Sequence, residues 1–146
     1  MVIDIYPQGD PEPIDIFDRN CVLIMDNDRE YLKYLTSCFS QQNFKVLSHT
    51  SGELGLQTAR KLEPDCILIN LELLDMDGIS LCQSIVDDSQ TCGIPVIVMG
   101  KTDDRDVIRQ AKAAGCEFFV AKPIDPKNLL MLVNETIAEA RSWICE

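Results

Sequence analysis

Five short apolar runs, each followed by a segment with helical periodicity, constrain the fold of this chain more than any other feature. The apolar runs span residues 21–25, 44–47, 66–69, 94–99 and 117–121. Apolar residues then recur at helical spacing over residues 28–41, 51–62, 78–86, 103–114 and from 126 onward. Alternating strands and helices form a parallel sheet covered on both faces, whose strands are continuously apolar. The pattern predicts an α/β domain with a doubly wound, five-stranded parallel sheet, a (βα)5 unit.

Capping residues support several of these helix ends. Asp28 precedes the first helical segment and is a good N-cap, and Gly115 follows the fourth as a C′ residue. Asp125 and Pro126 provide an N-cap and a first helical position for the last helix.

Composition excludes several classes of function. The formal net charge of −11 argues against binding nucleic acid or an anionic membrane, which both require Lys and Arg. The seven cysteines form no Cys-x-x-Cys pair, and His49 is the only histidine. We therefore expect a reducing, cytoplasmic location and no structural metal or other cofactor. No apolar stretch approaches the length of a membrane span, and no signal peptide is visible.

The chain divides into three parts on composition. Residues 1–19 are an N-terminal extension with three prolines, several acids and two Ile-Asp-Ile sequences, at 3–5 and 14–16. This extension is either a flexible tail or an arm that packs on this protein or on a partner. Residues 20–142 form the predicted domain, and residues 143–146 form a short C-terminal end.

Polar residues follow the predicted strands, at the edge where doubly wound sheets bind ligands. They are Asp26, Asn27 and Asp28 after the first strand, Asn70 after the third, and Gly100 and Lys122 after the fourth and fifth. Together with Met76-Asp77-Gly78 and Ala121-Lys122-Pro123, this set resembles the receiver domain of two-component response regulators. Separations of 44 residues from Asp26 to Asn70 and 52 from Asn70 to Lys122 fit that family. The resemblance spans about residues 19–141 and implies the flavodoxin-like receiver fold.

The same resemblance shows where this chain departs from the family. It implies a phosphate-accepting aspartate at the position of Asn70, a magnesium-binding acid at Asn27 and a hydroxyl residue at Gly100. It also implies magnesium coordination by the backbone carbonyl of Glu72 and a phosphate-contacting lysine at Lys122. An amide lacks the anionic oxygen that attacks phosphorus, and Mg²⁺ favours carboxylates. We therefore expect a degenerate pseudo-receiver that is not an enzyme and binds no metal.

Further expectations concern the degenerate pocket. Lys122 should pair with Asp26, and Lys122-Pro123 resembles the family's cis X-Pro turn. Gly100 should leave an empty space into which the switch aromatic Phe119 is permanently turned. Glu72 or Asp75 is the alternative acceptor if phosphorylation by a histidine kinase persists at a surrogate acid.

A protein partner is the most direct functional expectation for such a chain. Arg105, Arg109 and Lys112 form a basic line at helical spacing, either as a solvated helix face or as a docking site for an acidic partner. That partner would be a signalling protein, a histidine kinase or another regulator. Alternatively, the chain forms a homodimer. The chain would then be a stand-alone bacterial regulator. The remaining alternative is a small-ligand or redox sensor that uses the vacant pocket or the thiols of Cys92, Cys116 or Cys145.

Overall fold

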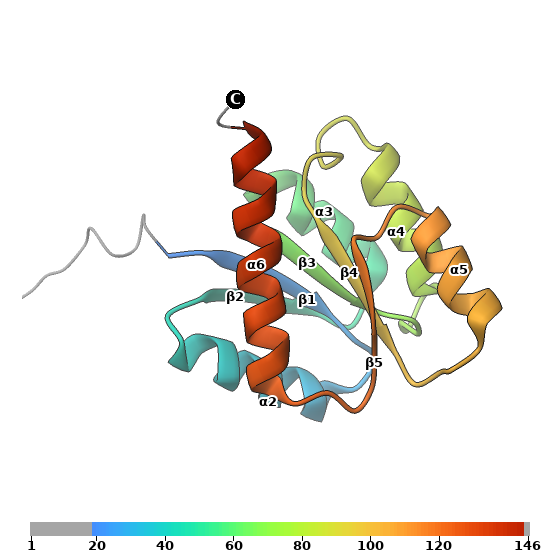
Figure 1. The fold of residues 1–146 in the computed structure, drawn as a ribbon, viewed down its shortest axis with the longest axis horizontal. Coiled ribbons are helices and arrows are strands. Elements are labelled where there is room, and N and C mark those ends of the chain that lie inside the picture. The colour runs from blue at the N-terminus through green and yellow to red at the C-terminus, as the bar shows by residue number, and fades with distance from the viewer. Residues whose placement is uncertain (1–18, 145–146) are drawn as a thin grey trace, which may run out of the picture.

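The computed structural model describes residues 19–144, in which five strands alternate with five helices (Figure 1). The first half contains β1 (Cys21–Met25), α2 (Arg29–Gln41), β2 (Lys45–His49), α3 (Gly52–Leu62) and β3 (Cys66–Asn70). The second half contains α4 (Gly78–Asp87), β4 (Val96–Gly100), α5 (Arg105–Ala113), β5 (Phe118–Ala121) and α6 (Pro126–Ile144). These bounds lie within two residues of the predicted ones. The extension at residues 1–18 lies outside the described residues.

All five strands are parallel and lie in the order β2-β1-β3-β4-β5. The chain moves outward from β1 to β2, then returns past β1 to β3 and continues to β5. The direction therefore reverses between β1 and β3, which is the switch point where doubly wound sheets form their binding sites. The predicted doubly wound, five-stranded sheet is confirmed.

Side chains of each central strand alternate between two cores. Val22 and Ile24 of β1 join the core beneath α2 and α6, while Leu23 and Met25 join the core beneath α3, α4 and α5. Figure 1 shows these helices on either side of the sheet. Both faces are buried, which explains why the strands are continuously apolar.

The predicted caps are present. The Asp28 carboxylate accepts hydrogen bonds from the amides of Glu30 and Tyr31 at the start of α2. Asp125 accepts one from the amide of Lys127 at the start of α6. Gly115 follows α5 with a φ of 108°, a conformation that suits glycine. Within residues 19–144, none of these helices is both long and apolar enough to cross a membrane.

Gly78 provides a test of how closely α4 approaches β3. A Cβ atom at this position would overlap the backbone carbonyl oxygen of Asn70, whereas one at Gly93 would meet no neighbouring atom. We expect Gly78→Ala to lower the free energy of unfolding by about 1–3 kcal/mol, because backbone must move to accommodate the methyl group. Gly93→Ala should change it by less than about 0.5 kcal/mol. Urea denaturation of both variants is the measurement, and equal stabilities would contradict the packing described.

Candidate functional site

The strand register brings the predicted site residues together at the carboxyl edge of the sheet. Met25 of β1 lies beside Ile69 of β3, so the residues that follow β1 lie next to Asn70. The ends of β4 and β5 complete the same pocket, which has a volume of about 410 Å³. It is lined by Asp26, Asn27, Asp28, Asn70, Leu71, Glu72, Gly100, Lys101 and Lys122. All five positions predicted for the degenerate phospho-acceptor pocket therefore line one cavity.

A buried ion pair forms the floor of this pocket. The Nζ atom of Lys122 lies 2.6 Å from Oδ2 of Asp26, which is fully buried, so the predicted pairing is present. The other carboxylate oxygen of Asp26 accepts a hydrogen bond from the amide of Asp28. Nζ also lies 4.3 Å from the centre of the Tyr31 ring, a cation–π contact. The positive charge of Lys122 is thus already engaged.

The side-chain amide of Asn70 occupies the middle of the pocket. Its Nδ2 atom donates hydrogen bonds to the backbone carbonyl of Glu72 at 2.9 Å and to Oδ1 of Asn27 at 3.3 Å. A carbonyl can only accept, so the NH₂ end of the amide must face Glu72. The two hydrogens of this group therefore satisfy two oxygens that converge on one point.

Those two oxygens belong to the set that the receiver resemblance assigns to magnesium. A cation at that point would be repelled by the NH₂ group of Asn70, and Asn27 offers a neutral amide oxygen. Two of the three carboxylates that line the pocket are engaged elsewhere, Asp26 by Lys122 and Asp28 by the N-terminus of α2, which leaves the exposed Glu72 at the rim. Mg²⁺ favours carboxylate oxygens, so this donor set does not fit it.

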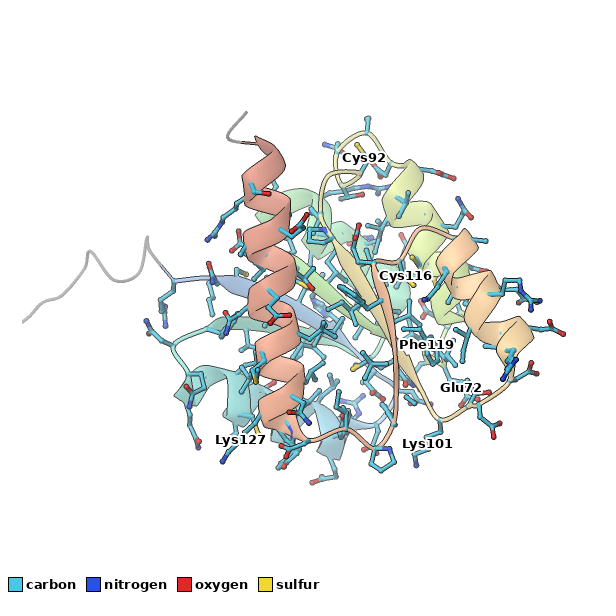
Figure 2. All side chains as sticks on the ribbon, viewed as in Figure 1. Glu72, Cys92, Lys101, Cys116, Phe119 and Lys127 are labelled. Atoms are coloured by element: carbon cyan, nitrogen blue, oxygen red, sulfur yellow. The ribbon has the colours of Figure 1, made fainter. Side chains whose placement is uncertain are left out.

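Leu71 occupies the space above Gly100. A Cβ atom at position 100 would overlap Cδ1 and Cγ of the Leu71 side chain. The expectation that Gly100 leaves an empty space is therefore wrong, because the residue next to Asn70 fills it. Phe119 (Figure 2) is partly buried and packs against the core beneath α3, α4 and α5. Leu71 packs against the same core.

The two candidate surrogate acids have different surroundings. Glu72 is exposed at the rim of the pocket. Asp75 lies at the N-terminus of α3, where its carboxylate accepts hydrogen bonds from the amides of Gly52 and Glu53 and from the Ser51 hydroxyl. The hydrogen bond from Gly52, followed by that from Glu53, holds the pKa of Asp75 below its usual value. Asp75 therefore serves as a helix cap.

The predicted basic line lies on α5. Arg105, Arg109 and Lys112 are all exposed. Arg109 Nη1 lies 2.6 Å from Oδ1 of Asp106, one turn earlier on the same helix. An exposed pair of this kind contributes little to stability and leaves the arginine available to a partner.

The exposure of one cysteine differs from the sequence prediction. Cys92 is exposed in the loop before β4, as predicted, but Cys116 is buried (Figure 2). Cys116 precedes β5, and its side chain packs into the core beneath α4 and α5, so an exposed Cys92–Cys116 pair is wrong. Burial also raises the pKa of Cys66 and of Cys82 to about 12. Cys145 lies outside the described residues.

Comparison with known proteins identifies the family. The chain matches the family model of the response regulator receiver domain over residues 22–134, and it belongs to that family. Receiver domains act in signal transduction and are generally signalling domains rather than enzymes. The solved structure of a putative response regulator from Chloroflexus aurantiacus superposes with a TM-score of 0.77 at 26% identity, covering 82% of this chain and 98% of that one. A CheY-like receiver domain protein from Methanospirillum hungatei gives 0.80 at 20% identity, with coverage of 85% and 98%.

Two sequence relatives differ in how much of their length is matched. The heme response regulator HssR of Staphylococcus epidermidis is 30% identical over 118 residues, which cover 81% of this chain and 51% of HssR. Protein PilH of Pseudomonas aeruginosa is 26% identical over 117 residues, which cover 80% of this chain and 97% of PilH. The chain therefore spans about half the length of HssR, as it does of the MtrA relatives.

Sequence reasoning missed three residues that shape the site. Leu71 fills the space above Gly100, Tyr31 lies against Lys122, and Asp75 caps α3. Tyr31 was accessible from the sequence, because it lies in the first helical turn after Asp28. Leu71 and Asp75 lie in the loop after β3, and hydrophobic periodicity does not predict the conformation of a loop.

The contact between Gly100 and Leu71 can be tested by a double-mutant cycle. We expect Gly100→Ala to lower the free energy of unfolding by about 1–3 kcal/mol, because the new methyl group displaces Leu71. In a Leu71→Ala background the same change should cost less, with a coupling of about 0.5 kcal/mol or more. Urea denaturation of the four proteins measures this coupling, and additive effects would show that the two positions do not compete for space.

Thiol alkylation tests the assigned burial of the cysteines. Among the cysteines of residues 19–144, iodoacetamide at pH 8 should modify Cys92 first, because its side chain is exposed. Cys66 and Cys82 should stay unmodified, since at a pKa of about 12 only about one thiol in 10⁴ is ionised at that pH. Peptide mass spectrometry identifies the sites, and modification in guanidinium chloride provides the control. Modification of Cys116 as fast as Cys92 would contradict the structure.

Proposed function

We propose that this chain is a pseudo-receiver that regulates a signalling pathway by phosphorylation-independent binding to another protein, in the cytoplasm. The observation that carries the proposal is the position of the Asn70 amide. Its NH₂ group is hydrogen-bonded to Glu72 and Asn27, where the family's chemistry requires a nucleophilic carboxylate and a metal ion. The scaffold is retained, and the groups that perform phosphoryl transfer are replaced.

Each replacement removes a separate requirement of the reaction. The amide oxygen of Asn70 is uncharged and a poor nucleophile. Asn27 and Asn70 supply no negative charge to balance a cation against an incoming phosphoryl group. Gly100 provides no hydroxyl, and Leu71 lies above it. Lys122, one of the two lysines that line the pocket, is held by the buried carboxylate of Asp26.

The exposed basic line on α5 is our candidate partner face. Arg105, Arg109 and Lys112 are positive on a chain whose net charge is −11, so they favour an acidic surface on the partner. The partner is a signalling protein, such as a histidine kinase or another regulator. A second copy of this chain is the other candidate for this face.

Intact mass spectrometry after incubation with acetyl phosphate and Mg²⁺ tests the loss of phosphoryl chemistry. The wild type should gain no adduct of one phosphoryl group. The double variant Asn27→Asp/Asn70→Asp, which restores two carboxylates, should be stabilised against unfolding by millimolar Mg²⁺, whereas the wild type should not.

A stoichiometric phosphoryl adduct on the wild type would contradict the proposal. Peptide mapping of such an adduct to Glu72 or Asp75 would establish the surrogate-acid alternative instead.

The partner face can be tested with charge-reversed baits. Affinity capture with Arg105→Glu/Lys112→Glu should retain the specific partner at least tenfold less than the wild type, because two attractive charges become repulsive. The matched control is Lys33→Glu/Lys61→Glu, two exposed lysines on α2 and α3 whose reversal changes the net charge by the same amount. Equal loss of the partner with both baits would indicate a general charge effect, and equal retention by all three would exclude the α5 face.

A further inference from the structure

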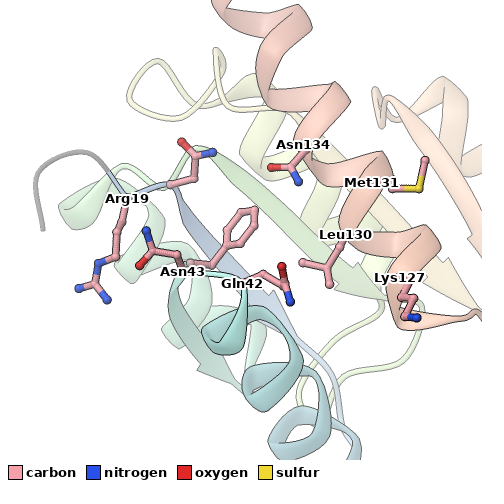
Figure 3. Close-up of a pocket in the computed structure, with 9 residues that line it drawn as sticks. Arg19, Gln42, Asn43, Lys127, Leu130, Met131 and Asn134 are labelled. Carbon is pink, nitrogen blue, oxygen red and sulfur yellow. The ribbon is translucent and has the colours of Figure 1, made fainter. Parts of the chain in front are cut away.

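A groove between α6 and the C-terminal end of α2 lies away from the Asn70 pocket. Its volume is about 490 Å³, and it shares no lining residue with that pocket (Figure 3). Lys127, Leu130 and Met131 contribute from the first turns of α6, Gln42 and Asn43 from the end of α2, and Arg19 from the start of the described chain. Figure 3 shows Arg19 and Lys127 at opposite ends of the groove, with Gln42 and Asn43 between them.

The chemistry of this groove is unusual for such an acidic chain. Its lining contains two cations, Arg19 and Lys127, and no carboxylate. It also has an apolar wall, since Met131 is 60% exposed next to Leu130. The groove therefore suits an extended segment that carries both acidic and large apolar side chains.

Arg19 supplies an independent indication of an occupant. Its Nε atom is buried and has no hydrogen-bond partner among residues 19–144. A buried guanidinium nitrogen without an acceptor is costly, and a carboxylate or a backbone carbonyl would satisfy it.

The chain itself contains a segment of the required chemistry, directly before Arg19. Residues 1–18 contain five acids and no Lys or Arg. Their last part reads Ile14-Asp15-Ile16-Phe17-Asp18, with acidic and apolar residues interleaved. We infer that residues 14–18 bind in the groove between α2 and α6, with apolar side chains against Met131 and carboxylates toward Arg19 and Lys127.

The distances allow this arrangement. The face of α6 from Lys127 to Asn134 is about 10 Å long at 1.5 Å per residue. An extended segment advances about 3.3 Å per residue, so four or five residues before Arg19 are enough to run along it. Because the groove and the Asn70 pocket share no residue, either proposal can fail while the other holds.

The test uses the full chain with ¹³C-labelled methionine methyl groups, of which there are five. Met131→Leu assigns the Met131 methyl resonance. We expect nuclear Overhauser effects from that methyl group to the ring protons of Phe17. In the variant Ile16→Ser/Phe17→Ser the resonance should shift, because its apolar neighbour is lost, and in Lys127→Glu the Overhauser effects should weaken.

The sequence offers a matched control, because residues 3–6 read Ile-Asp-Ile-Tyr and residues 14–17 read Ile-Asp-Ile-Phe. The variant Ile5→Ser/Tyr6→Ser should leave the Met131 methyl resonance unchanged. The reverse pattern, or no response to either variant, overturns the inference. Overhauser effects or shifts that vanish on dilution also overturn it and assign the groove to a second copy of the chain.

Discussion

The hydrogen bonds of one side-chain amide determine the character of the site. Asn70 donates to the Glu72 carbonyl and to Asn27, and so joins β3, its following loop and the end of β1 at the switch point of the sheet. In the receiver family a metal ion satisfies the corresponding oxygens. An NH₂ group provides directed donors without adding charge, so these two hydrogen bonds join the three segments directly.

The other residues of the pocket are also paired or packed. Asp26 is the buried acid of the pocket, and Lys122 balances its charge across the sheet from a position 96 residues later in the chain. Breaking this pair would leave a buried charge uncompensated. Leu71 lies above Gly100, so an apolar contact stands where the family places a hydroxyl. Asn27, Asn70 and Gly100 thus belong to a packed and internally hydrogen-bonded site.

Periodicity and capping chemistry were sufficient to predict the fold. Apolar runs that alternate with segments of helical periodicity indicated the parallel sheet. Helix ends were indicated by Asp28, Gly115 and Asp125, and the structure confirms them. The strand order then places Asp26, Asn70 and Lys122 in one pocket, as predicted. The filling of the space above Gly100 could not be predicted, because it depends on how the loop after β3 directs Leu71. The burial of Cys116 was missed for a similar reason: the residue lies in a loop, but that loop packs into the core.

The most direct test of this account is the response of the Asn70 side-chain NH₂ signals to magnesium. Selective labelling with ¹⁵N-asparagine, with assignment by Asn70→Ala, resolves these two protons by NMR. The account predicts that they exchange slowly with water and that their shifts stay constant as MgCl₂ rises to millimolar concentrations, because Nδ2 already donates to Glu72 and Asn27. A saturable shift with loss of exchange protection would show that magnesium displaces the amide, and would contradict the central claim.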